Sequence, residues 1–483
     1  MRRCASLIHA LKSVGMALIH AFSRRKMILL LIAAAAVRIV ILLAFPSVFA
    51  FEQTGTIHGS SSYDSYARNL IDTGVYGLTP GVPDALIPPL YSYVLAAVYA
   101  IFGRGSLQVG VFHTALDLIS ILLLADITRR LFAYVVDERI AKRADWIGWL
   151  AGVFYAFYPY LIFQNLTLID TPLFITLLYA FLWLVVLLRD EDTTDNAAWG
   201  LALLAGVVLG LAALTRPVIA FLAVLLPLWF LCTRSFTTTL IRLGVIAVIS
   251  VMTLVPWMAR NYSLYDQFVA ISTTAGSNFY QGNNDDVIPF LRAGYDAQWT
   301  APAEGEITAP DPNSPEADQQ RFALGLRYLQ ENQAAIPELL WVKFQAHWSI
   351  DIFPRLNPTE SGIDPALYAG AAEVVTGENG IDLSGVPQGD PVAAYSGGEF
   401  TAGRFVHRYY FGMHVVLAVI GIVLSLRDWR DVSLLWLIQI SMTIAYAVIF
   451  HPSTRYRAPT DPLLFVFAAY TLVWAWVKIA RSK

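Results

Sequence analysis

Residues 24–51 read RRKMILLLIAAAAVRIVILLAFPSVFAF and carry the clearest structural signal in the chain. Three basic residues precede a run of 25 residues in which Arg38 is the only charged side chain. About 20 apolar residues are enough for a helix to cross the hydrocarbon core, and positive charge concentrates on the cytoplasmic side. This stretch therefore predicts a membrane-spanning helix that follows a cytoplasmic flank.

The rest of the 483-residue chain repeats this pattern, because 57% of the residues are hydrophobic and only 14% are charged. Soluble domains carry about a quarter charged residues, so soluble, disordered and collagen-like classes are excluded. The only two cysteines, Cys4 and Cys232, give no disulfide framework and no cysteine zinc site. We predict an all-α polytopic membrane protein with ten spans, the later nine near 107–131, 145–163, 171–188, 197–214, 217–232, 241–259, 408–426, 431–450 and 460–477.

Charge is divided unevenly along the chain and predicts its orientation. Residues 261–403 contain 19 acidic and five basic residues, net −14, whereas the rest contains 17 acidic and 28 basic residues, net +11. Alternating the spans places this acidic stretch outside, where basic residues are scarce. It also places both termini in the cytoplasm. The expected location is the cytoplasmic membrane, and an acidic outer segment makes nucleic acid a poor partner.

The predicted organisation has four parts. Residues 1–26 form a cytoplasmic interfacial helix, with a cleaved signal peptide as the competing interpretation. Residues 27–260 form the transmembrane catalytic bundle, including an outer loop at 51–106. Residues 261–403 form an extracytoplasmic insert, and 404–483 the C-terminal transmembrane helices.

The apolar run 90–103 is too short to span the bilayer. Its 14 residues make a helix of about 21 Å, against a core of about 30 Å. We expect a juxtamembrane or re-entrant helix on the outer face, opened by Pro88 and Pro89. Backbone at that depth needs protein or a water-filled cavity around it, so a cavity near the outer leaflet is expected.

Two carboxylates on the outer side are candidates for chemistry. Asp64 lies in the first outer loop between Tyr63 and Tyr66, whose rings can stack on sugars. Asp170 lies at the mouth of two predicted helices, where a carboxylate is costly and often functional. The alternative for Asp64 is an ordinary solvated loop acid. The alternative for Asp170 is a cap on the helix that begins at Thr171.

Outer segments also carry arginines beside prolines, against the orientation bias of positive charge. Guanidinium groups suit phosphate oxygens and stay charged, so a lipid-linked phosphate at the outer leaflet would explain several arginines together. The alternatives are snorkelling to lipid headgroups and pairing with Asp64 or Asp170. The outer arginines are Arg216, Arg260, Arg455 and Arg457.

A polar turn at 277–284 presents side-chain amides, which include that of Asn283.

Cofactor signals are weak. The histidines show neither HxxxH nor HExxH spacing, so a divalent metal is possible but unsupported by ligand spacing. Nucleotide-binding motifs are missing in a credible context, and no cofactor is assigned. The histidines considered were His58, His113, His347, His407, His414 and His451.

Six short segments in this order resemble the GT-C superfamily of polyprenyl-phosphate-sugar-dependent glycosyltransferases. The similarity is greatest to bacterial relatives of protein O-mannosyltransferases and of lipid A aminoarabinose transferase. It extends from Met27 to about Trp476, and it implies a GT-C-like helix bundle with outer juxtamembrane helices. The segments are Tyr63-Asp64-Ser65-Tyr66, Pro88-Pro89-Leu90-Tyr91, Asn165 with Asp170, Leu214-Thr215-Arg216-Pro217, Pro256-Trp257 through Arg260-Asn261-Tyr262 to Gly282-Asn283-Asn284, and Arg455-Tyr456-Arg457-Ala458-Pro459 with Pro462.

The resemblance implies roles for individual residues. Asp64 would activate the acceptor hydroxyl, and Asp170 would lie near the sugar or a partner arginine. Arg455 and Arg457 would lie near the lipid phosphate, with Arg216 and Arg260 as further phosphate contacts. The expected substrate contacts are Tyr63, Tyr66, Tyr91, Asn165, Asn283 and Tyr456.

Two departures from the family pattern limit the assignment. Many relatives carry Asp-Glu in the first loop, whereas Ser65 follows Asp64 here, which leaves the acid–base details open. The aminoarabinose branch carries a lysine where this chain has Ile87, which argues against that donor.

The expected activity is sugar transfer from a polyprenyl-phosphate donor on the outer face, with inversion at the sugar. The acceptor, whether glycan, lipid or protein, stays open. One rival is a non-enzymatic carrier of a lipid phosphate or solute. Another is an O-antigen-type polymerase or ligase, which would use pyrophosphate donors.

Overall fold

The computed structural model describes residues 24–45, 60–189, 195–233, 236–354 and 398–479. Every regular element in these ranges is helical, and eight helices are long and apolar enough to cross a membrane. The predicted all-α polytopic architecture is confirmed. The predicted interfacial helix at 1–26 lies almost wholly outside the described residues. The long helices are α2 (Arg24–Ala44), α5 (Ser106–Phe132), α9 (Thr171–Arg189), α10 (Asp195–Thr215), α12 (Phe236–Tyr265), α19 (Gly398–Leu424), α20 (Trp429–Thr443) with η6 (Leu426–Asp428) and η7 (Ile444–Ile449), and α22 (Asp461–Ile479).

Two of the ten predicted spans are not among these eight helices. The run 145–163 is divided into α7 (Ala144–Ala156) and α8 (Pro159–Asn165), because Pro159 has no N–H and Tyr158 before it is extended. The run 217–232 becomes the 15-residue α11 (Ile219–Thr233). The run at 90–103 is helix α4 (Leu90–Phe102), preceded by α3 (Ser60–Thr73).

The remaining helices belong to the acidic insert and to short connections. The insert has its own small apolar core, which includes Val287, Leu339 and Val342. These helices are α6 (Glu138–Ala141), α13 (Ala275–Gln281), α14 (Val287–Ala293), η2 (Ala297–Trp299), α15 (Pro315–Glu331), η3 (Gln333–Ala335), α16 (Ile336–His347) and α21 (Thr454–Arg457).

Close approach and a buried ion pair hold the bundle together. Cβ atoms at Gly206 and Gly210 of α10 would lie within 3 Å of α12 atoms, so only glycine allows this contact. Arg38 of α2 pairs with Asp117 of α5, and the Tyr155 hydroxyl of α7 donates to Asp117 at 2.6 Å. This network joins three helices, so the one charge in the first span has a structural role.

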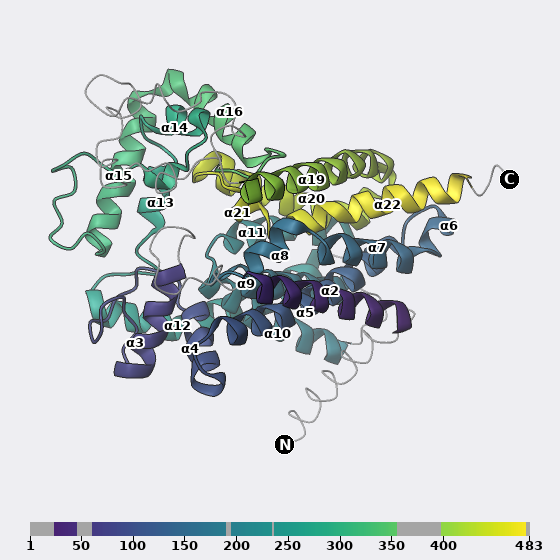
Figure 1. Cartoon of the computed structure of the whole chain (residues 1–483), viewed down its shortest axis with the longest axis horizontal. Coiled ribbons are helices and arrows are strands. Elements are labelled where there is room, and N and C mark those ends of the chain that lie inside the picture. The colour runs from purple at the N-terminus through teal and green to yellow at the C-terminus, as the bar shows by residue number, and fades with distance from the viewer. Residues whose placement is uncertain (1–23, 46–59, 190–194, 234–235, 355–397, 480–483) are drawn as a thin grey trace.

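Apart from α7, α8 and α11, which pack against the long helices, the short helices of the described ranges gather at the two ends of the bundle. Figure 1 shows α3, α4 and the insert helices α13–α16 at one end, and α6 with the last turns of α22 at the other. The basic residues predicted to face the cytoplasm include Arg129 and Arg143, which flank α6. The acidic insert is therefore separated from this basic end, as the predicted orientation requires, and the orientation itself stays a prediction.

Candidate functional site

A cavity of about 230 Å³ opens where the insert meets the ends of the bundle helices. Its wall combines segments that are hundreds of residues apart: α3, the loop before α9, the α10–α11 turn, α13, and the link from η7 to α21. Its lining residues are Tyr63, Pro88, Asp170, Thr215, Arg216, Pro217, Val218, Phe221, Ser272, Thr274, Ala275, Asn278, Tyr446, Phe450, His451, Arg455 and Tyr456. An expected cavity and five predicted site residues thus meet in one place.

Asp170 and Arg216 form the charged centre of this wall. Arg216 follows α10 and precedes Pro217, which cannot continue the helical hydrogen bonding, so the side chain turns toward the start of α9. Its Nε and Nη2 each donate to a carboxylate oxygen of Asp170 at 2.6 Å, and Nη2 also donates to Thr171 Oγ1 at 2.7 Å. The Asp170 carbonyl accepts from Phe174 N, so its backbone starts α9 while its side chain pairs with arginine.

The charges around Asp170 decide its protonation. Burial would raise the pKa of this carboxyl, but the Arg216 guanidinium, its hydrogen bonds and then Arg455 lower the pKa below the ordinary value. Arg455 Nη2 lies 3.7 Å from Asp170 Oδ1. Asp170 is therefore ionised at neutral pH and shared by two cations.

Aromatic rings form the rest of the wall. Tyr456 stacks on Tyr446 with ring centroids 4.6 Å apart and an interplanar angle of 6°. Tyr63 packs edge-on against Tyr91, with centroids 4.9 Å apart. Flat rings beside charged groups can hold a sugar by stacking while the charges hold a phosphate.

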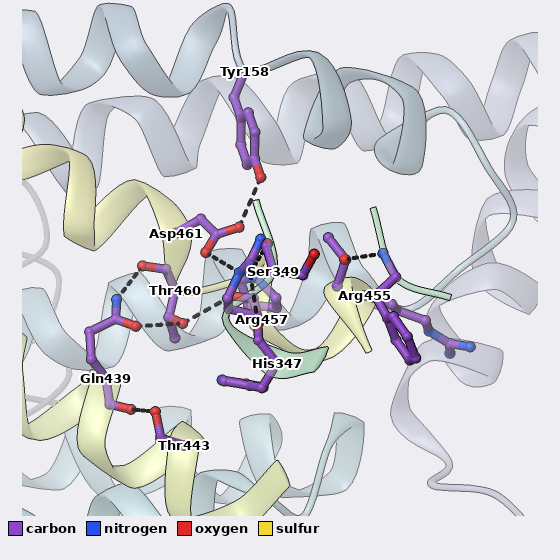
Figure 2. A network of polar contacts seen from close by, with 12 residues as sticks. Tyr158, His347, Ser349, Gln439, Thr443, Arg455, Arg457, Thr460 and Asp461 are labelled. Atoms are coloured by element: carbon purple, nitrogen blue, oxygen red, sulfur yellow. Dashed lines mark hydrogen bonds and ion pairs between the residues drawn. The ribbon is translucent and has the colours of Figure 1, made fainter. Parts of the chain in front are cut away.

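Arg457 has a different position from Arg455, although both belong to α21. Figure 2 shows Arg457 in the middle of a network and the Arg455 side chain at its edge, pointing elsewhere. Arg457 donates to Asp461 Oδ1 at 2.9 Å and to the carbonyls of His347 and Ser349. Tyr158 completes the network by donating to Asp461 Oδ2 at 2.8 Å. Arg457 is absent from the cavity wall and joins α16 to α22.

Asp64 is also absent from the cavity wall. Adjacent residues on a helix point about 100° apart, so Tyr63 faces the cavity while Asp64 faces α4 and its following loop. The Tyr99 hydroxyl, Arg104 and Arg68 all donate to its carboxylate at 2.8–3.0 Å. Its carboxylate is thus held in an ion-pair network outside the cavity wall, and its role as the base stays a prediction.

Arg260 and Tyr66 brace the loop between α3 and α4. Arg260 donates to the carbonyls of Asp84 and Tyr76 at 2.6 and 2.9 Å, and its guanidinium lies over Trp257. Tyr66 donates to the Asp84 carboxylate. Neither residue lines the cavity, so neither is placed to contact a ligand there.

Three other predicted substrate contacts also have different surroundings. The Tyr91 hydroxyl lies 2.9 Å from His113 Nε2, behind Tyr63. Asn283 Nδ2 donates to the carbonyls of Phe279 and Ile449, at 2.7 and 2.8 Å. Asn165 is the last residue of α8, and its side chain lies outside what the structure describes.

Asn283 and Lys343 together tie the insert to the π-helix η7. Lys343 Nζ donates to the carbonyls of Gly282 and Val448, at 3.1 and 3.0 Å. In a π-helical turn some carbonyls lack their usual helical donor. Lys343 and Asn283 donate to two such carbonyls of η7, those of Val448 and Ile449. The tie positions Phe450 and His451, which follow directly and line the cavity.

Several wall residues were not predicted. His451 was given no role at the site, although it stands four residues before Arg455, where the last segment of the resemblance begins. Asn278 belongs to the polar turn at 277–284 but was not named as a contact, and Tyr446, Ser272 and Thr274 come from segments that showed no distinctive pattern. Among the described residues, no three or more His, Cys, Asp or Glu side chains gather in a metal-binding cluster.

A family model described as GPI transamidase subunit PIG-U matches residues 32–281, slightly more than half of the chain. The chain belongs to this PIG-U family. The matched range contains Asp170 and Arg216 and most of the cavity wall, while Tyr446, Phe450, His451, Arg455 and Tyr456 lie beyond it. A comparison with curated protein sequences gives no match.

Solved structures show weaker likenesses. The apo oligosaccharyltransferase of Archaeoglobus fulgidus is 15% identical with a TM-score of 0.48, covering 95% of this chain and 52% of that one. ArnT from Cupriavidus metallidurans, bound to undecaprenyl phosphate, is 16% identical with a TM-score of 0.41, covering 92% and 75%. This PIG-U family chain thus spans about half the length of the archaeal enzyme. Because these TM-scores are below 0.5, the likenesses say nothing about the activity of the present chain.

Proposed function

We propose that this chain is a membrane glycosyltransferase that takes its sugar from a polyprenyl-phosphate donor held in the cavity. The observation that carries the proposal is Arg216: its side chain lines the cavity, yet its buried Nη1 has no hydrogen-bond partner among the described residues. A buried guanidinium nitrogen without an acceptor is costly, and an anion would supply the acceptor.

The charge of the wall supports a single phosphate. Asp170 contributes one negative charge, and Arg216 and Arg455 contribute two positive charges, so the trio has a net charge of +1. A polyprenyl-phosphate sugar is a phosphodiester with one negative charge and would neutralise it. A pyrophosphate-linked donor would leave an excess of negative charge beside Asp170, so we favour the monophosphate over the polymerase or ligase alternative.

The proposed reaction uses the same groups. As the sugar leaves, its phosphate gains a second negative charge, which Arg455 and Arg216 would stabilise. Attack by the acceptor from the opposite face inverts the sugar, and Tyr63, Tyr446 and Tyr456 offer rings against which it can stack. The acidic insert, which supplies Asn278 and Thr274, is proposed to bind the acceptor.

A reconstituted preparation incubated with radiolabelled polyprenyl-phosphate mannose or glucose tests the proposal. We expect release of free polyprenyl phosphate above a protein-free control. Binding of the donor without release would favour the second candidate, a site that holds a phosphate-bearing glycolipid without cleaving it. The family description supports that candidate, because it names a transamidase subunit rather than a glycosyltransferase.

A further inference from the structure

The identity of the proton acceptor rests on the proposed function and deepens it. Transfer of a sugar to a hydroxyl group needs a base that takes the hydroxyl proton, and the cavity wall has few candidate bases. Asp170 is held at both oxygens by Arg216, arginines stay protonated, and burial raises the pKa of Tyr63 and Tyr456. Apart from the tyrosines, His451 is the remaining side chain of the wall that can take a proton, through a ring nitrogen.

A carboxylate and a hydroxyl both lie at Nε2 of His451. Its Nε2 lies 3.9 Å from Asp296 Oδ1 and 3.3 Å from the Tyr456 hydroxyl, which belongs to another residue of the wall. Asp296 is fixed by Gln298, whose backbone N and Nε2 donate to its two oxygens at 3.1 and 2.9 Å. Both groups are at the same ring nitrogen, and a carboxylate within about 4 Å of an imidazole favours its protonated form by charge attraction.

Other charged groups around His451 come from each element packed against it. Arg455 stands on α21 and Asp170 on the far side of Arg455, while Tyr446 comes from η7. Lys343 of α16 donates to the carbonyls of Gly282 and Val448 nearby, and burial lowers its pKa to about 7. Burial also raises the pKa of Asp296 to about 7, so this carboxyl can gain or lose its charge near neutrality.

We propose that His451 is the general base of the transfer, reached through the Tyr456 hydroxyl, and that Asp296 is its positioning residue. The acceptor oxygen forms a bond to C1 of the sugar. The bond from C1 to the phosphate oxygen breaks, and its electron pair stays on the phosphate. The acceptor proton passes to Tyr456, whose own proton passes to His451 Nε2, and the imidazolium later releases it to water.

The test measures donor cleavage and polyprenyl-phosphate affinity in the same reconstituted preparations. His451→Gln should lower kcat by about 100- to 10,000-fold with affinity unchanged, because only the proton acceptor is lost. Tyr456→Phe should lower kcat with little change in KM. Asp296→Asn should move the acid limb of the kcat–pH profile to lower pH, because the imidazolium loses its carboxylate. His414→Gln, a buried histidine of α19 that does not line the cavity, is the matched control.

The outcomes separate the two levels of the account. Wild-type kcat and an unshifted pH profile in His451→Gln would overturn the base assignment and leave the proposed function standing. A wild-type preparation that cleaves no donor would overturn both. An unchanged pH profile in Asp296→Asn would remove Asp296 as the positioning residue, and retained affinity shows in each case that the variant is folded.

Discussion

Asp170 and Arg216, 46 residues apart in sequence, meet in a two-point ion pair in which both carboxylate oxygens lie 2.6 Å from guanidinium nitrogens. The pair joins the start of α9 to the end of α10 and at the same time forms part of the cavity wall. A change to this pair can therefore alter both the stability of the fold and the proposed binding of the donor, so variants are needed that affect only one of the two.

Removing Arg216 alone should be more damaging than removing the pair. Arg216→Ala leaves Asp170 buried without its main partner, which typically costs roughly 3–5 kcal/mol. The double variant Asp170→Ala/Arg216→Ala avoids this uncompensated charge and should recover part of the loss. Denaturant unfolding in detergent measures both free energies, and a double variant less stable than either single variant would contradict the coupling.

Asp296 should make the protein less stable as pH rises. Burial raises its pKa to about 7, well above the value of about 4 in an unfolded chain. The folded state therefore keeps a proton that the unfolded state has released between about pH 4 and 7, and stability falls across this window. Thermal unfolding at pH 5 and 8 measures the slope, and Asp296→Asn should flatten it. An identical slope in the variant would show that Asp296 does not contribute.

Asp64→Asn should reduce stability rather than abolish chemistry. The variant weakens the interactions with Arg104 and Arg68 around a fully buried carboxylate, at a cost of about 1–3 kcal/mol. Donor cleavage per folded molecule should stay within a few-fold of wild type. Asp72→Asn, an exposed acid on the same helix, is the control. Complete loss of cleavage in a fully stable Asp64→Asn protein would restore Asp64 as the base.

Gly282→Ala should disturb the cavity from the insert side. A Cβ at Gly282 would lie 2.5 Å from the carbonyl carbon and oxygen of Phe450 and 3.0 Å from His451 N, so the backbone must move. We expect lower stability and weaker binding of polyprenyl phosphate. Gly200→Ala, where a Cβ meets nothing within 4 Å, should leave both unchanged. Unaltered binding in Gly282→Ala would mean that the insert does not shape the cavity.

The helical class and most spans were predictable from the sequence, because hydrocarbon thickness sets how many apolar residues a span needs. The exceptions follow from local chemistry. Pro159 divides α7 from α8, and no count of apolar residues registers that break. The run 217–232, by contrast, has only 16 residues in the sequence, and the 15-residue α11 is correspondingly short.

The candidate site was only partly predictable, because sequence order does not say which way a side chain points. Asp64 and Tyr63 are neighbours in sequence, but only Tyr63 lines the cavity. Arg455 and Arg457 share a motif, but Arg457 donates to Asp461 and to two carbonyls. Buried arginines can serve structure or ligands, and the choice depends on acceptors supplied by distant segments.

Comparing the affinity for polyprenyl phosphate of the wild type and of Arg455→Gln shows whether the cavity holds the lipid phosphate. Arg455→Gln leaves the Asp170–Arg216 pair intact, so stability is preserved while one phosphate contact is lost. We expect affinity about 10- to 100-fold weaker, as for the loss of one charge-assisted hydrogen bond, and wild-type affinity in the control Arg321→Gln, a half-buried arginine of α15 that does not line the cavity. Equal affinities in the wild type and Arg455→Gln would show that the lipid phosphate is not held in this cavity.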